Sequence, residues 1–183
     1  MQEKSHRKLF QGLAFGIDGL SVDWITNNVY WTDTDTKWIM VGNEDISIYT
    51  HVVPIASKVP SIVAVDPLTR TIYWSEVDTA ESRLLKCGMD GKNVVTLQTF
   101  TDVVSIDSLI FDVIGKRLFW GERIPSTVVG QSYTGRVRSM SSTNSSDIKI
   151  EHTAINSRFM GISSLQGFSL HRKQPTKLGV CYE

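Results

Sequence analysis

An excess of charge of either sign is absent from this sequence, because 19 Lys and Arg residues balance 19 Asp and Glu residues over 183 positions. A balanced chain offers no attraction to the phosphates of nucleic acid and no basic block for an anionic membrane surface. Long apolar runs are also absent, since none approaches the roughly 18 to 20 residues of a membrane span. We therefore expect no nucleic-acid partner and no direct membrane insertion of this chain.

Cysteine is scarce, with only Cys87 and Cys181, which excludes a disulfide-rich secreted module. Residues 1–10 lack the apolar core, about 7 to 15 residues long, of a secretory signal. These two observations leave open a cytosolic chain and a piece of a longer protein that carries its signal elsewhere. The sequence also lacks a nucleophile elbow, a phosphate loop, a His/Cys metal spacing and a dinucleotide fingerprint.

What the sequence does contain is an internal repeat. Each copy has an Asp seven residues before an aromatic–Trp pair and an acid two residues after that Trp. The copies cover 22–33, 65–76 and 111–122, with their Trp residues 43 and 46 positions apart. The recurring residues are Asp23, Tyr30, Trp31, Thr32 and Asp33, then Asp66, Tyr73, Trp74, Ser75 and Glu76, then Asp112, Phe119, Trp120, Gly121 and Glu122.

Apolar and polar residues alternate in each copy, as in half-buried strands, on both sides of a short polar turn. In the second copy, a third strand is predicted at 83–87, a turn at 89–91 and a fourth strand at 93–97. Four short strands in a repeat of roughly 40 to 45 residues are typical of a propeller blade. We predict an all-β protein with four-stranded antiparallel blades near 18–60, 61–105 and 106–160.

The repeat also suggests what its residues do. Adjacent Tyr and Trp residues on a strand point to opposite faces, so we expect them to pack against the two neighbouring sheets. One acid per blade does not form a catalytic pair, which needs a separation of roughly 5 to 10 Å. We expect the acids to accept hydrogen bonds from strand-end or turn amides, with axial calcium left as an alternative. Gly12, Gly16 and Gly19 are interpreted as loop glycines.

The motif Tyr30-Trp31-Thr32-Asp33 resembles the YWTD signature of the low-density lipoprotein receptor class B repeat, and 73–76 and 119–122 resemble degenerate copies. Residues 86–91 resemble the family's turn from a basic residue to Asp-Gly. The first and third copies depart from it, with Met40 and Arg138 at the basic position and no Asp-Gly turn. Family propellers have six blades, so the resemblance implies a partial YWTD β-propeller, about three to four of six blades, over 1–175.

The C-terminal part resembles the exit from such a propeller. The resemblance implies a closing strand at 161–171 and an exit segment at 176–183 that leads toward an absent EGF-like module. Cys181 would then form a disulfide with that module, and His171 is a candidate pH-sensitive residue near the junction. An incomplete ring leaves blade faces open, so we expect the isolated chain to be poorly soluble or marginally stable.

Other candidate sites lie outside the motif. Asn144 begins an N-glycosylation sequon in a Ser-rich loop, 139–146, that we expect to be exposed. Cys87 is expected to be a buried free thiol. The turn region of Trp38 and an insertion at 123–133 are candidate binding loops, since long loops often carry binding.

The resemblance implies a non-catalytic extracellular binding scaffold, part of an endocytic lipoprotein-receptor-type protein. Its implied partners are protein ligands and neighbouring EGF-like modules, and its place is the outer face of a membrane receptor or a secreted protein. No cofactor is implied for this chain, because calcium binding and the other receptor features belong to the parent's modules. A nidogen-like matrix adhesion propeller and a calcium-dependent propeller hydrolase are the alternatives.

Overall fold

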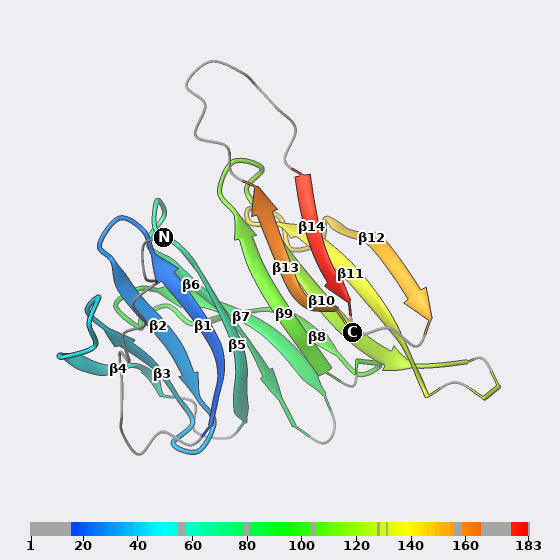
Figure 1. The fold of residues 1–183 in the computed structure, drawn as a ribbon, viewed down its shortest axis with the longest axis horizontal. Helices are drawn as coiled ribbons and strands as arrows, with labels where there is room; N and C mark the ends of the chain where they lie inside the picture. The colour runs from blue at the N-terminus through cyan, green and yellow to red at the C-terminus, as the bar shows by residue number, and fades with distance from the viewer. Residues whose placement is uncertain are drawn as a thin grey trace, which may run out of the picture.

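The computed structural model describes residues 16–54, 58–78, 81–103, 105–127, 129–130, 132–155, 159–165 and 177–182, all in strands, turns and short connections. Three sheets of four strands follow one another along the chain (Figure 1). They are blade 1, β1 (Ile17–Asp23), β2 (Asn28–Asp33), β3 (Trp38–Gly42) and β4 (Tyr49–Pro54); blade 2, β5 (Val59–Asp66), β6 (Thr71–Val77), β7 (Ser82–Gly88) and β8 (Val95–Phe100); and blade 3, β9 (Ser105–Asp112), β10 (Arg117–Pro125), β11 (Tyr133–Ser141) and β12 (Ile148–Ile155). The predicted all-β class and the three four-stranded antiparallel blades are confirmed.

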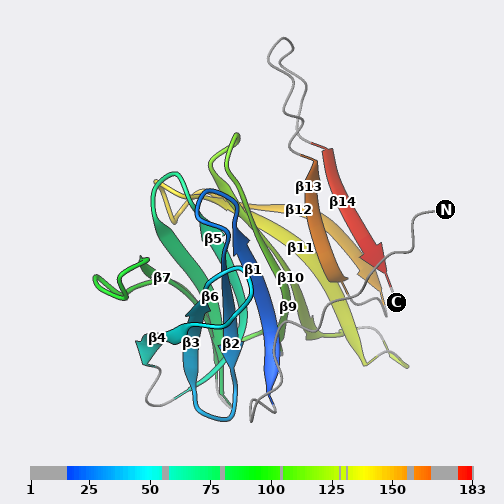
Figure 2. The ribbon, with the colours of Figure 1, turned by 60° about the vertical axis from the view of Figure 1, so that its left-hand side comes forward.

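The blades stack through their first strands. Strand β1 lies against β5, and β5 lies against β9, so the sheets pack face to face as successive layers (Figures 1 and 2). Within each sheet, strands adjacent in sequence pair antiparallel in the order first, second, third, fourth. This meander places one edge strand of each blade beside the next blade, which is the packing of a propeller.

The turn between the first two strands has the same construction in every blade. The carboxylates of Asp23, Asp66 and Asp112 accept the backbone N–H two residues later, at 2.8, 3.1 and 3.1 Å. Four residues after each Asp the backbone is left-handed, with φ of 60° at Asn27, 55° at Arg70 and 51° at Lys116. Such a conformation costs a non-glycine residue roughly 1 to 2 kcal/mol. The capping acid and the flanking ladder offset this cost and fix the hairpin register.

The aromatic–Trp pair splits between two interfaces. Tyr30 of blade 1 and Trp74 of blade 2 lie in one buried cluster between those blades. Tyr73 of blade 2 and Trp120 of blade 3 lie in the next cluster, where Tyr73 stacks on Phe111 with ring centroids 5.1 Å apart. Because neighbours on a strand point to opposite faces, one dipeptide fills two interfaces.

Gly19 is a strand residue and not the loop glycine that the sequence suggested. A Cβ at Gly19 would lie 2.7 Å from the Cα of Ile62, so β1 and β5 approach too closely for a side chain. The N–H of Gly19 donates to the Thr32 hydroxyl (2.9 Å), which in turn donates to the carbonyl of Ser61 (2.7 Å). Ser75 repeats the first of these bonds by accepting the N–H of Ile62 at 3.2 Å. In blades 1 and 2, the hydroxyl at the third motif position therefore holds the bulged first strand of its own sheet.

Three boundaries differ from the expected ones. The insertion at 123–133 is paired strand at both of its ends, because β10 and β11 continue their ladder to Pro125 and Tyr133. Trp38 opens β3 instead of lying in a turn. The Ser-rich loop is shorter than 139–146, since Ser139 is fully buried in β11, where Arg117 donates to its hydroxyl. Continued cross-strand pairing thus absorbs residues whose polarity suggested loops.

A fourth, two-stranded sheet joins β13 (Phe159–Leu165) to β14 (Lys177–Tyr182) in antiparallel register. Strand β13 lies against β9, as β9 lies against β5, so it takes the first-strand place of a further blade (Figure 1). Strand β13 begins at Phe159, whereas the sequence predicted a closing strand at 161–171. The segment at 176–183, expected as an exit, instead contains a paired strand, because its apolar residues alternate as a strand requires.

Candidate functional site

Two ends of the stacked sheets can be distinguished from the strand order. We call the end that carries the first-to-second and third-to-fourth turns of each blade the turn end. The opposite end, which carries the second-to-third turns and the connections between blades, we call the loop end. Charged side chains form paired networks at the loop end of blades 2 and 3, and this region is the first candidate site.

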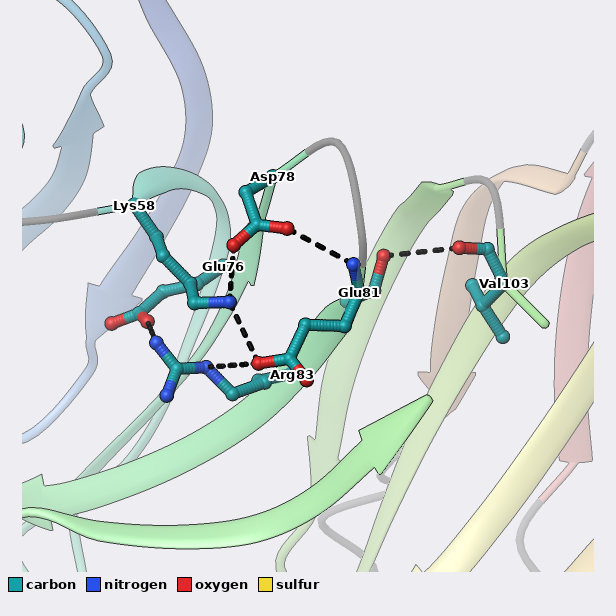
Figure 3. Close-up of polar contacts among 7 residues, drawn as sticks. Lys58, Glu76, Asp78, Glu81, Arg83 and Val103 are labelled. Carbon is teal, nitrogen blue, oxygen red and sulfur yellow. Dashed lines mark hydrogen bonds and ion pairs between the residues drawn. The ribbon is translucent and has the colours of Figure 1, made fainter. Parts of the chain in front are cut away.

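In blade 2 the network begins at Lys58, just before β5 (Figure 3). Its ammonium donates to Asp78, which follows β6, and to Glu81, which precedes β7, the latter at 2.7 Å. These hydrogen bonds raise the pKa of Lys58. Asp78 also accepts the N–H of Glu81 at 3.0 Å, which closes the turn. One cation therefore holds the between-blade connection against the β6–β7 turn.

Glu76, the acid of the second motif, lies beneath this network. Its carboxylate accepts the indole N–H of Trp74 at 2.9 Å and a guanidinium N–H of Arg83 at 2.9 Å. Arg83 is the cross-strand partner of Glu76 on β7, and its Nε lies 3.7 Å from Glu81. The motif acid thus ties the interface Trp to the surface charges.

Blade 3 repeats this arrangement with two arginines. Glu122, with a side chain that is fully buried, accepts the indole N–H of Trp120 at 2.7 Å and the Nε–H of Arg136 at 2.7 Å. Arg138 adds a contact at 3.3 Å and lies over the rings of Trp120 and Phe100. A buried carboxylate with these three donors is fully paired.

A second cluster in blade 3 is centred on Arg123 of β10. Its guanidinium donates to Ser105 at 2.8 Å and to Asp107 at 3.0 Å, and it lies 5.6 Å from the ring centroid of Tyr133. The two ends of the segment expected to be a loop therefore place a guanidinium and an aromatic ring side by side on paired strands.

Blade 1 uses its motif acid differently. Asp33 accepts the backbone N–H groups of Asp35 and Thr36, at 3.1 and 3.0 Å, and so caps its own turn. The longer Glu76 and Glu122 instead reach the motif Trp and arginines. The expectation of bonds to turn amides therefore describes the four recurring Asp residues and was wrong for the two Glu residues, whose extra methylene extends their reach.

The acids at this end are held in structural pairs. The buried carboxylates of Glu76 and Glu122 are each bound by arginine, and paired acids of this kind are structural. Among the described residues, no group of three His, Cys, Asp or Glu side chains could hold a metal ion. The arginines were missed by sequence reasoning because the loop between each Glu and its Arg differs in length, so no fixed spacing signals the pair.

The remaining candidate residues lie elsewhere. Asn144 is exposed in a turn at the turn end, where its side-chain oxygen accepts the N–H of Ser146 at 3.0 Å. Cys87 is a buried free thiol, as predicted, and burial raises its pKa to about 12. Cys181 lies in β14, where the structure describes the backbone alone. His171 lies outside the described residues altogether.

No protein-family model matches the chain. The vitellogenin receptor of Solenopsis invicta is 37% identical over 111 residues, which cover 60% of this chain and 6% of that protein. Only a small fraction of that relative's length is therefore represented in this chain.

Solved structures show the same fold at low identity. A nidogen/laminin complex matches with a TM-score of 0.55 and 18% identity, over 82% of this chain and 69% of that chain. The PQQ-bound aldose sugar dehydrogenase of Streptomyces coelicolor matches with a TM-score of 0.56 and 15% identity, over 74% and 47%. At these identities the likeness concerns fold alone, and it includes an enzyme.

The receptor relative, the repeat motif and the nidogen-like fold together support a YWTD-repeat propeller of the low-density lipoprotein receptor type. In the described part of the chain, no helix has the length and apolar character to cross a membrane.

Proposed function

We propose that this chain is a non-catalytic, extracellular protein-binding module of a receptor, and that the loop end of blades 2 and 3 contributes to its ligand surface. The observation that supports this most is the 37% identity to a vitellogenin receptor. Vitellogenin, or a lipoprotein of similar kind, is accordingly the candidate ligand, and endocytosis is the candidate process.

The loop-end chemistry supports the same proposal. The buried acids are paired with arginines, and one of these, Arg123, which pairs with Asp107, also lies beside the ring of Tyr133 on paired strands. Arginine and tyrosine are enriched where proteins bind proteins. Such a surface can bind an acidic protein segment without catalytic groups.

The test is binding of vitellogenin to the immobilised full chain, measured by surface plasmon resonance at neutral pH. We expect saturable binding that Arg123→Ala weakens about tenfold or more, as for a central interface arginine. Lys37→Ala, at the β2–β3 turn of blade 1, serves as the control. Binding of laminin in place of vitellogenin would favour the matrix adhesion alternative. Binding of neither would refute the receptor proposal for this chain.

Three finer expectations remain predictions. Release of ligand near pH 6 would depend on His171, and it would be unchanged by His171→Ala if that residue is only a surface histidine. Cys181 would pair with a cysteine of an EGF-like module. Asn144, exposed in its turn, would carry a glycan when the protein passes through the secretory pathway.

A further inference from the structure

A groove of about 490 Å³ lies at the turn end between blades 1 and 2, at the end of the molecule away from the loop-end network. Ile25, Val41, Pro67 and Met89 give it an apolar lining. Ile25 is about half exposed, with 52% of its surface accessible. The groove is therefore open at its rim and has the volume of a typical ligand site.

The polar groups of the groove come from both blades. Tyr30 is 4% exposed, and its hydroxyl makes no hydrogen bond with any residue that the structure describes. Burial raises the pKa of Tyr30, and Asp23 acts in the same direction, whereas the charge of Arg70 opposes them. The Tyr30 hydroxyl is thus a neutral donor close to a cation.

Arg70 is the cation at the rim. Its left-handed backbone is held in the capped β5–β6 turn, and its side chain is exposed. No described carboxylate forms an ion pair with Arg70, although ten such pairs occur elsewhere in the described chain. A cation beside an apolar floor and a phenolic donor is complementary to a carboxylate.

Two acids also line the groove. Asp23 is buried, and its carboxylate is occupied by the N–H groups of Ile25 and Thr26 and by the Thr26 hydroxyl. Asp90 is exposed and lies 3.8 Å from the ammonium of Lys92. The first acid is therefore satisfied. Asp90 accepts the N–H of Lys92 through Oδ1 at 3.1 Å, so its Oδ2 is the atom that would accept an N–H from a bound chain.

The equivalent position between blades 2 and 3 is bridged. Lys86, the cross-strand partner of Tyr73, reaches the carbonyl of Ser142 at 3.5 Å, and Gln98 donates to the carbonyl of Ser145 at 2.7 Å. In blade 1 the cross-strand partner of Tyr30 is Val41, which is too short to bridge. The strand register therefore puts Val41 at the place of Lys86, and not Met40 as the sequence suggested, so blade 1 has no amine that could bridge this groove.

Gly91 fixes the other wall. Its φ is 76°, and a Cβ there would lie 2.1 Å from the carbonyl oxygen of Val52. The turn that carries Met89 and Asp90 is therefore pressed directly on β4 of blade 1. Since the wall is held by backbone contact, the groove is preformed and does not depend on a mobile loop.

We propose that this groove binds an extended segment of a partner protein in which an aliphatic side chain precedes a carboxylate side chain. The aliphatic group packs on Ile25, Val41 and Met89, and the carboxylate pairs with Arg70 and accepts from Tyr30. Asp90 accepts a backbone N–H of the segment. This site is independent of the proposed loop-end surface, because it lies at the opposite end of the blades.

The test is a titration of the full chain with the capped peptide acetyl-Gly-Leu-Asp-Gly-amide, followed through the methyl resonances of Met89 and Ile25. We expect saturable shifts and roughly two- to fivefold weaker binding of the Leu-Asn peptide, the value of one exposed ion pair. Arg70→Gln should cause a similar loss, and Lys116→Gln, the equivalent change in blade 3, should cause none.

Val41→Lys should abolish the shifts by installing the bridge that Lys86 forms. If this variant does not melt cooperatively, the Arg70→Gln variant still tests the proposal, because Arg70 is exposed and its replacement should leave the fold intact. Shifts that do not saturate, or equal binding of both peptides, would overturn the proposal. Shifts that depend on protein concentration alone would also overturn the proposal, because they would indicate that a second copy of this chain occupies the groove. Loss of vitellogenin binding with intact peptide binding would refute only the loop-end proposal.

Discussion

Blade 1 and blade 2 present equivalent sheet faces in different surroundings. Val65 of blade 2 is 7% exposed in the interface with blade 1, whereas Val22, at the same position of blade 1, is 49% exposed. Val63 and Leu20 form a similar pair, at 1% and 60%. The two faces have the same apolar pattern, so the neighbouring sheet, and not the strand's own sequence, determines which valine is buried.

The motif acids show a second contrast between blade 1 and its neighbours. Asp33 caps a turn, whereas Glu76 and Glu122 join an interface Trp to arginines. Blade 1 therefore has an accessible apolar face and a short acid, and blades 2 and 3 have covered faces and long acids. The expectation that an accessible apolar face makes the isolated chain prone to association stays a prediction.

The largest effect should come from the buried acid of blade 3. Glu122→Ala leaves Arg136 and Arg138 without their shared carboxylate, which should lower the free energy of unfolding by about 3 kcal/mol. Asp33→Ala removes only a turn cap and should cost about 1 kcal/mol. Urea denaturation of both variants measures the contrast. Equal losses of unfolding free energy in the two variants would show that the length of the motif acid does not distinguish blade 1 from blade 3.

A smaller effect should separate the two equivalent valines. Val65→Ala removes buried methyl groups from the interface and should destabilise the protein by about 2 kcal/mol. Val22→Ala should change the free energy of unfolding by less than about 0.5 kcal/mol, as exposed substitutions usually do. Thermal melts of the two variants under one set of conditions test this. A large loss at Val22 would mean that this face is covered in solution.

The smallest effect concerns reactivity. Burial raises the pKa of Cys87 to about 12, so at pH 8.5 the folded thiol stays protonated while an unfolded one, with a pKa of roughly 8.5, is half ionised. The contribution of this thiol to stability is present below that pH and is lost as the pH rises toward 12. Iodoacetamide labelling, located by peptide mass mapping, should spare Cys87 in the folded chain.

The control for this labelling is Val22→Cys, on the accessible face of blade 1. Its thiol should react rapidly under the same conditions. Rapid labelling of Cys87 in the folded chain would show that the interface between blades 1 and 2 opens readily.

Much of the fold was predictable because local rules repeat. The Asp, the polar turn and the aromatic–Trp pair recur with fixed spacing, so each copy indicates the same hairpin. The loop at 123–133 and the Ser-rich loop were predicted less well, since cross-strand pairing extended β10 and β11 through polar residues. The sequence likewise gave no sign that Gly19 lies in a strand, because its reason is the approach of β5.

The candidate sites were less predictable than the fold. The pairing of Glu76 with Arg83 follows from antiparallel register, which depends on the length of the intervening turn. The groove beside Arg70 combines residues of two blades, so no motif within one repeat contains it.

The amino-acid sequence by itself determined the all-β class, the three blades and the residues that point to each sheet face, because strand periodicity and turn chemistry act over a few residues. Only the tertiary structure decided which of two equivalent faces is buried, which acids meet arginines and where a groove stays open. Those features depend on contacts between strands and blades distant in sequence, where a valine at position 41 in place of a lysine changes the space available.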